Sequence, residues 1–332
     1  PTIVAGGGSV SSGASDQVRQ LADLLQIPVM TTPQAKGIIP EDSHLATGVN
    51  SAVGPAKAVL PDTDLVIAIG TRLSLRGVSP DNMPPILQID VERDQIGKHF
   101  PVELGIVGDA SETLTSVISA LSVDDSKLAT RRERAERLKK QFADQVVKLA
   151  SPQVSVIDKI SNVLPDDAIV VQGMTNIGYW SSAAMPMDSI RKYVTSSYFG
   201  TLGFAFPTAL GCQTAFPERK VVALCGDGGF MYSPQELSTA MRYGLNTVAV
   251  VFNNGAFGAS RWDQQHQFNG RYIGTDLFNP DFVAMAKSFG AEGIKTDADN
   301  IDQGLAEALT LDKPTLLEVE IPNMMPPFQI VE

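Results

Sequence analysis

The chain has 332 residues, of which 43% are hydrophobic, and its formal net charge is −11 at pH 7. This length and composition suffice for two α/β domains, each with its own hydrophobic core. The acidic balance argues against nucleic acid and anionic membrane surfaces as partners, and the apolar runs are strand-length, too short to cross a bilayer.

The first third of the chain alternates short apolar segments with a helical pattern. Such alternation is typical of a doubly wound parallel sheet. We therefore expect a first, Rossmann-like α/β domain over residues 1–122. Its predicted strands are Thr2–Ala5, Ile27–Met30, Leu65–Ile69 and Ile86–Ile89, and its predicted helix is Ser15–Leu25.

A glycine-rich turn, Gly6-Gly7-Gly8, follows the first predicted strand and has two interpretations. Its backbone would let a phosphate approach closely, with Arg72 near that phosphate and Asp90 on a ribose hydroxyl. This arrangement would bind a nucleotide. Because a glycine-rich turn alone is a weak signal, we favour a domain that keeps the fold and binds no nucleotide.

Residues 123–150 are rich in charge. Between Arg131 and Lys140 both signs of charge recur at helical spacing, which indicates a solvated helix that joins two domains. The acidic background disfavours a nucleic-acid interpretation of this basic run. The second α/β domain is then expected over residues 151–332.

The second domain contains the most informative motif of the sequence. After a strand at Ala168–Val171, the predicted strand Val221–Cys225 ends at Gly226-Asp227-Gly228. The next predicted strand, Thr247–Phe252, ends at Asn253-Asn254. Two strands joined by a helix are parallel, so Asp227 and Asn254 should emerge side by side where α/β proteins bind ligands.

The helix between these two strands has clear boundary signals. Ser233 is its expected N-cap, Pro234 its first residue and Glu236 the partner of a capping box. Gly244 is the expected stop at its carboxyl end.

A carboxylate, an amide oxygen and a helix N-terminus converge at this edge, a combination that suits a divalent metal holding a diphosphate. Asp227 alone would repel phosphate, because like charges about 4 Å apart cost roughly 4 kcal/mol at an effective dielectric near 20. Mg²⁺ would bridge the two groups through oxygen ligands. We predict the Asp227 and Asn254 side chains and the Ala256 carbonyl as those ligands. Either motif alone is more often a turn, and their joint spacing favours the metal.

These residues resemble a known cofactor motif. Gly-Asp-Gly followed about two dozen residues later by Asn-Asn is similar to the motif that binds thiamine diphosphate (ThDP). Ser196–Pro207 resembles 2-oxo-acid decarboxylases and acetolactate synthases, and Asn253–Trp262 resembles the benzoylformate decarboxylase branch. Ile3–Gly8 and Ile67–Arg72 look like the central domain of the same enzymes. The resemblance thus covers a central and a diphosphate-binding domain.

The resemblance implies a cofactor and a reaction class. ThDP and Mg²⁺ would support decarboxylation or carboligation of 2-oxo acids, with Leu202 as a catalytic residue that separates the two rings of the bent cofactor. Ordinary core packing is the alternative for Leu202. In the central domain some relatives bind FAD, some bind ADP and others bind no nucleotide. We favour a central domain without a nucleotide here. The residues that the resemblance assigns to the cofactor are Gly173, Thr175, Asn176, Gly200, Leu202, Gly226, Asp227, Gly228, Gly229, Asn254, Ala256, Phe257 and Gly258.

The same family implies a further domain. Its members carry a pyrimidine-binding domain whose glutamate activates the cofactor, and nothing in this sequence resembles that domain. We therefore expect the chain to be inactive unless the domain is supplied in cis or by a separate subunit. By analogy, a homodimer or homotetramer is expected. The alternative function is a non-catalytic regulatory subunit that binds ThDP or a nucleotide.

The segment after Asn254 lines the substrate pocket in the decarboxylase branch. Ser260 and Asp263 stand where apolar side chains would suit an aryl substrate, so we expect a smaller or more polar 2-oxo acid. His266 is a candidate acid–base catalyst, because an imidazole titrates near neutral pH. A surface histidine is the favoured alternative, since no partner can be named.

The two cysteines, Cys212 and Cys225, offer no disulfide framework and are expected to be buried free thiols. The amino end lacks a basic segment followed by a long apolar stretch. Both features favour a cytoplasmic location.

Overall fold

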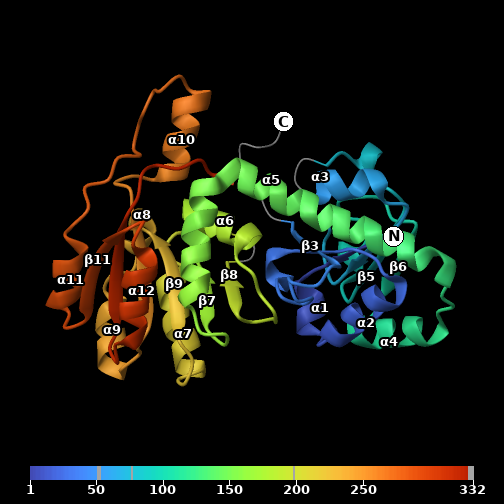
Figure 1. Cartoon of the computed structure of the whole chain (residues 1–332), viewed down its shortest axis with the longest axis horizontal. Coiled ribbons are helices and arrows are strands. Elements are labelled where there is room, and N and C mark those ends of the chain that lie inside the picture. The colour runs from blue at the N-terminus through green and yellow to red at the C-terminus, as the bar shows by residue number, and fades with distance from the viewer. Residues whose placement is uncertain (51–53, 76–77, 197–198, 328–332) are drawn as a thin grey trace. The chain divides into compact units, whose positions relative to one another are not determined.

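The computed structural model describes residues 1–50, 54–75, 78–196 and 199–327 (Figure 1). Within them the chain divides into two compact units. The first comprises residues 1–149 and 186–191, and the second residues 150–185 and 192–327. Ser197 and Tyr198, which belong to the segment Ser196–Pro207 compared with the family above, lie outside the described residues.

The first unit is built on a parallel sheet of six strands in the order β3-β2-β1-β4-β5-β6. This confirms the predicted doubly wound α/β class. The pattern missed β3 and β6; all four residues of β6 are at least partly exposed, so β6 has no buried apolar run to recognise. The strands are β1 (Thr2–Ala5), β2 (Val29–Thr31), β3 (Ala46–Val49), β4 (Val66–Ile69), β5 (Ile86–Asp90) and β6 (Leu104–Val107).

Helices cover both faces of this sheet because its strands are apolar on both sides. Along β1, Ile3 and Ala5 belong to one core cluster and Val4 to another. The first cluster is covered by α2 (Ser15–Leu25), α4 (Ala110–Ala120) and the start of α5 (Leu128–Val163), and the second by α3 (Ala56–Val59). Figure 1 shows α2 and α4 side by side.

The glycine-rich turn of the first unit packs against the end of β4. Gly6 is the N-cap of the short helix α1 (Gly7–Ser11), and its amide donates to the Ile69 carbonyl at 2.9 Å. A Cβ on Gly8 would lie 2.8 Å from the Cα of Gly70, closer than side chains come. These glycines therefore have a packing role that requires no bound nucleotide.

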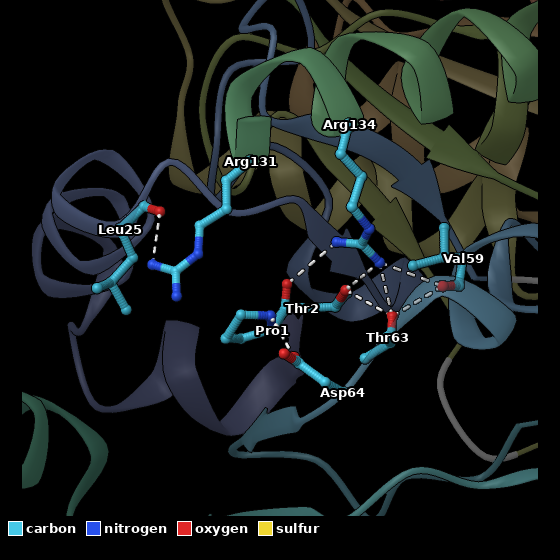
Figure 2. A network of polar contacts seen from close by, with 8 residues as sticks. All are labelled: Pro1, Thr2, Leu25, Val59, Thr63, Asp64, Arg131 and Arg134. Carbon is cyan, nitrogen blue, oxygen red and sulfur yellow. Dashed lines mark hydrogen bonds and ion pairs between the residues drawn. The ribbon is translucent and has the colours of Figure 1, made fainter. Parts of the chain in front are cut away.

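Helix α5 is anchored to the first unit by Arg134 (Figure 2). Its guanidinium donates to the Thr63 hydroxyl at 2.8 Å and to the Pro1 and Val59 carbonyls at 3.2 and 3.3 Å. Burial lowers the pKa of Arg134, but the nearby carboxylates of Asp62 and Asp64 favour its charged form. The helix has non-helical backbone at Ala150, φ −139° and ψ 37°, where one unit ends and the other begins.

The second unit also contains a parallel sheet of six strands, in the order β11-β12-β10-β9-β7-β8. The predicted strands at β7, β9 and β10 form within one residue of their expected limits. The strands are β7 (Ile169–Gln172), β8 (Tyr193–Thr195), β9 (Val221–Gly226), β10 (Val248–Asn253), β11 (Glu292–Asp297) and β12 (Thr315–Glu320).

The neighbouring strands β7 and β9 form a switch point in this sheet. Helix α6 (Asn176–Ala184) leads from β7 towards β8 at one edge, whereas α8 (Asp227–Phe230) and α9 (Glu236–Tyr243) lead from β9 to β10 on the other side. Open α/β sheets bind ligands at such a point, outside the carboxyl ends of the strands. The remaining helices are α7 (Ala205–Ala215), α10 (Gly258–Gln267), α11 (Phe282–Ser288) and α12 (Ile301–Thr310).

The predicted start of α9 was wrong. The helix begins at Glu236 after Gln235, without a side-chain cap, because Ser233 is buried and its hydroxyl donates to the Gly203 carbonyl at 3.4 Å. Its predicted end was correct, since Gly244 is the C-cap with φ of 61°.

Both cysteines are free, as predicted, but only Cys225 is fully buried and Cys212 is half-buried. Burial raises the pKa of the Cys225 thiol to about 12. None of the helices in the described ranges is long and apolar enough to span a membrane.

Candidate functional site

A cavity of about 210 Å³ opens at the switch point of the second unit. Loops that follow β7, β8, β9 and β10 line it, together with Ile321 after β12. Of the cofactor residues expected from the sequence, the lining includes Thr175, Asn176, Gly200, Leu202, Gly226, Asp227, Gly228, Gly229, Asn254, Ala256, Phe257 and Gly258.

Asp227 is the only carboxylate among the residues that line this cavity. It is 2% exposed, and burial raises its pKa, while hydrogen bonds from backbone amides and Asn279 act in the opposite direction. Its Oδ1 accepts from the Gly228 amide and its Oδ2 from Asn279 Nδ2, both at 2.8 Å. Among the residues that the structure describes, no lysine or arginine forms an ion pair with Asp227. The Asp227 carboxylate is therefore buried among hydrogen-bond donors, with no cation beside it among the described residues.

Asn254 and Ala256 face Asp227 from the next strand. The pairing of Phe252 with Gly226 in β10 and β9 brings the two turns together. Asn254 Oδ1 accepts from the Ala256 amide at 3.3 Å, which folds the chain back on itself. The turn is held from outside, because the Phe257 amide donates to the Thr275 carbonyl at 2.9 Å.

Besides the four-residue helix α8, two helices begin at the cavity without a capping side chain. Thr175 and Phe257 are the N-caps of α6 and α10, and neither helix has a side-chain hydrogen bond at this position. The free amides at a helix start attract anions, as does the local positive end of the helix dipole. Two such starts beside Asp227 suit a diphosphate that is joined to the carboxylate by a cation.

Two glycines of the cavity lining, Gly228 and Gly229, lie against apolar side chains. A Cβ on Gly228 would lie 2.5 Å from the Phe257 ring and 2.9 Å from Leu277. A Cβ on Gly229 would point towards Leu202, at 3.7 Å from its Cδ2. Leu202 therefore lies opposite a strip of bare backbone.

Asn176 contributes an unpaired acceptor. Its Nδ2 donates to the Met324 carbonyl at 2.6 Å, and this bond fixes the orientation of the amide. Its buried Oδ1 has no hydrogen-bond partner among the described residues. Buried polar atoms are normally paired, so this oxygen is suited to a bound group or water.

Two expected site residues do not line the cavity. Gly173 packs beside it, where a Cβ would meet the Leu224 carbonyl oxygen at 2.5 Å. His266 is exposed on α10, where its ring stacks on Trp262 at 4.3 Å and its Nδ1 lies 2.9 Å from the Trp262 carbonyl. Of the two residues expected to shape the substrate pocket, Ser260 lines the cavity and Asp263 does not.

The donor set fits magnesium better than a transition metal. The described residues contain no cluster of three or more His, Cys, Asp or Glu side chains suited to a metal. One carboxylate, one amide oxygen and a carbonyl are hard ligands, and Mg²⁺ commonly takes its remaining oxygens from phosphate and water.

The sequence pattern missed the residues that support this donor set. Asn279 lies 52 residues after Asp227 and donates to it, and Asn323 accepts from Asn254 Nδ2 at 3.3 Å. Tyr179 on α6 also lines the cavity. A Cβ placed on Gly258 would approach Asn323 and Asn254, so this side of the cavity is tightly packed.

Two family models match the chain. Residues 1–117 match the central domain of thiamine pyrophosphate enzymes, and residues 173–319 match their C-terminal TPP binding domain. Thiamine pyrophosphate is another name for ThDP.

The chain is also similar to curated proteins of this kind. It is 32% identical, over 98% of its length, to a "Probable acetolactate synthase large subunit" of Methanococcus aeolicus, of which it covers 60%. It is 32% identical over 97% of its length to the acetolactate synthase large subunit of Parasynechococcus marenigrum, of which it covers 54%. It is 28% identical over 96% of its length to a "Probable 2-ketoarginine decarboxylase" of Pseudomonas aeruginosa, of which it covers 57%. The chain thus spans between 54% and 60% of the length of these relatives.

Proposed function

The chain belongs to the thiamine pyrophosphate enzymes, and we propose that its second unit binds ThDP through Mg²⁺ for decarboxylation or carboligation of 2-oxo acids. The observation that carries this proposal is the buried carboxylate of Asp227, which has no cationic partner among the described residues and lies beside two uncapped helix starts. A divalent cation with a diphosphate would neutralise that carboxylate and satisfy those amides.

The proposed roles of the residues follow from their places around the cavity. Asp227, Asn254 and the Ala256 carbonyl hold the metal. The amides at the starts of α6 and α10, with Thr175 and Asn176, bind the diphosphate. Bare backbone at Gly226, Gly228 and Gly229 admits it, and Gly173, Gly200, Phe257 and Gly258 shape the surrounding wall.

When bound, ThDP would supply a carbanion that adds to the 2-oxo group and a ring that accepts the electron pair left behind as CO₂ departs. Leu202 would give the cofactor an apolar support opposite Gly229, in line with the catalytic role expected for it from the sequence. Ser260 places a small polar side chain at the cavity, which favours a small or polar 2-oxo acid over an aryl one. His266 has no part in this proposal, because it is exposed and stacked on Trp262.

We propose that another polypeptide segment completes the site, as a pyrimidine-binding domain in cis or in a separate subunit of a homodimer or homotetramer. Among the described residues no glutamate lines the cavity, and in this proposal the added segment supplies the group that activates the cofactor. Two large apolar side chains next in sequence to residues around the cavity are exposed, Phe199 by 81% and Phe278 completely. In this proposal the added segment covers them and removes their apolar surface from water.

We propose no nucleotide for the first unit, because close packing against Gly70 already accounts for its glycine turn. Denaturation of the purified protein should release no flavin absorbance, and a released flavin would contradict this part of the proposal. The proposed setting is the cytoplasm.

Calorimetric titration tests the proposed cofactor site. ThDP should bind only with Mg²⁺ present. Asp227→Ala removes a proposed metal ligand and should weaken this binding by more than about 100-fold, which exceeds the loss typical of residues that only orient a metal ligand. His266→Ala is the control and should bind normally. Metal-independent binding, or binding that survives Asp227→Ala, would contradict the proposal.

Deuterium exchange at C2 of bound ThDP, in the assembly that contains this chain, separates an enzyme from a regulatory subunit. Exchange faster than in free ThDP supports the catalytic function. Exchange at the rate of free ThDP would favour the regulatory alternative.

A further inference from the structure

We propose that Asn279 is a positioning residue of the metal site, and that it sets the orientation of the Asp227 carboxylate before any metal binds. This inference rests on the proposed function of the cavity. Asn279 does not line the cavity, and it precedes α11 in the chain. It acts through Asp227 and touches neither substrate nor cofactor.

Asn279 joins the ends of two strands through one amide nitrogen. Its Nδ2 donates to Asp227 Oδ2 at 2.8 Å and to Asn253 Oδ1 at 2.9 Å. Asp227 follows β9 and Asn253 ends β10, so a single side chain ties together the two turns that supply the proposed metal ligands.

The chemistry of the neighbours fixes which way each amide points. Asn253 Nδ2 donates to Glu318 Oε1 at 2.7 Å, and an ionised carboxylate can only accept. Asn253 Oδ1 must therefore face Asn279, and it also accepts from the Gly255 amide at 3.2 Å. The row Glu318, Asn253, Asn279, Asp227 thus has a carboxylate at each end and donors in fixed directions between them.

This row spans three adjacent strands. Glu318 is on β12, which pairs with β10, and β10 pairs with β9. Glu318 is 5% exposed, so its end of the row is anchored in the core. Asn253, the first asparagine of the Asn-Asn motif, therefore has a role of its own. Together with Asn279 it links Asp227 to the buried Glu318 on β12.

The bond from Asn279 occupies one direction of Oδ2, and the Gly228 amide occupies one of Oδ1. The backbone amides of Gly255 and Ala256 also act on this carboxylate, so its orientation is set from both turns. A carboxylate held in this way loses little further freedom when metal binds. Partners that orient a metal ligand typically contribute 10- to 100-fold in metal affinity.

Two variants separate hydrogen bonding from packing. Asn279→Ala removes the donor and the side-chain volume, and Asn279→Leu keeps a similar volume without a donor. Both should weaken Mn²⁺ binding, measured by electron paramagnetic resonance with ThDP present, by about 10- to 100-fold. The signal of the remaining bound Mn²⁺ should broaden, because the carboxylate adopts several orientations.

Asn246→Leu is the matched control. Asn246 also donates through Nδ2 to a carboxylate, that of Asp312, but it lies just before β10 at the opposite end of that strand. Its loss should leave Mn²⁺ affinity unchanged. Urea unfolding without metal reports whether each variant is folded.

The outcomes distinguish failure of the positioning role of Asn279 from failure of the proposed function. If the wild-type protein binds Mn²⁺ and ThDP at this site and Asn279→Leu binds them equally well, the positioning role is wrong and the proposed function stands. Loss in Asn279→Ala but not in Asn279→Leu would also overturn it, since packing alone would then explain the effect. If the wild-type chain binds neither Mn²⁺ nor ThDP even in the assembly that contains the completing segment, the proposed function fails first.

Discussion

Some individual residues of the site could be predicted from the sequence, and others could not. Asp227 and Asn254 were predictable because each stands directly after an apolar strand, and parallel pairing makes the two turns neighbours. Asn279 was not predictable, because it reaches Asp227 across 52 residues through a loop with no regular pattern. His266 lies exposed on α10 and outside the cavity lining, in agreement with the surface position that was the favoured interpretation of this histidine.

The pKa of Asp227 gives a pH dependence for the metal-free protein. Burial raises this pKa above its ordinary value of 3.8, so the folded state binds the proton more tightly than the unfolded chain. The contribution of Asp227 to stability is therefore lost as pH rises from about 3.8 through the raised pKa. Urea unfolding in EDTA should show this loss in the wild type but not in Asp227→Asn. A difference between the two proteins that does not change with pH would contradict it.

The buried ion pair of the first unit makes a second prediction for individual residues. Lys36 Nζ lies 2.6 Å from Glu41 Oε1, and the lysine side chain is 0% exposed. Lys36→Met leaves a carboxylate without its partner and should lower the free energy of unfolding by about 3–5 kcal/mol. The double variant Lys36→Met/Glu41→Gln should recover most of that loss in urea unfolding. Equal stability of the single and double variants would show that the pair is unimportant.

Whole helices and strands followed the periodic pattern where their residues are buried on a regular face. Helix α2 spans Ser15–Leu25 as predicted, and β1 spans Thr2–Ala5 as predicted. The start of α9 did not follow its local signal, because a tertiary contact of Ser233 with Gly203 replaced the expected cap. Local capping residues are a weak guide where another loop competes for the same hydroxyl.

Helix α5 should depend on Arg134 for its attachment to the first unit. Arg134→Ala removes a half-buried guanidinium and should cost about 1.5–3 kcal/mol of unfolding free energy, the range for hydrogen bonds to charged groups. Arg134→Lys should recover part of this loss, because lysine keeps the charge without the planar fork.

Arg132→Ala is the control for this prediction. Its ion pair with Glu136 is exposed on both sides, 58% and 47%, so its removal should change stability by less than about 0.5 kcal/mol. Equal losses in the Arg132 and Arg134 variants would mean that the network in Figure 2 contributes nothing specific.

For the molecule as a whole, each unit contains a six-stranded parallel sheet, and both sheets were foreseen from the alternation of strands and helices. Which of the two sheets carries a ligand-binding cavity could be predicted from the sequence only in part. Both units have glycines after a strand. Only the contacts show that Gly6 and Gly8 pack on Gly70, whereas Gly228 and Gly229 line a cavity, where Gly228 also packs against Phe257.

The proposed site also predicts a stability response that is confined to the second unit. A ligand at 100 times its dissociation constant adds about 2.7 kcal/mol to the unit that binds it. Hydrogen exchange with ThDP and Mg²⁺ should therefore slow in the loops after β7, β9 and β10 and remain unchanged in the first unit. Protection in the first unit alone would place the ligand elsewhere.

The most direct measurement is a crystal structure with ThDP and Mn²⁺, with data collected for anomalous scattering. The proposed site predicts one Mn²⁺ peak in contact with the side chains of Asp227 and Asn254, next to the diphosphate. A Mn²⁺ peak elsewhere, or ThDP bound away from these two residues, would contradict the account.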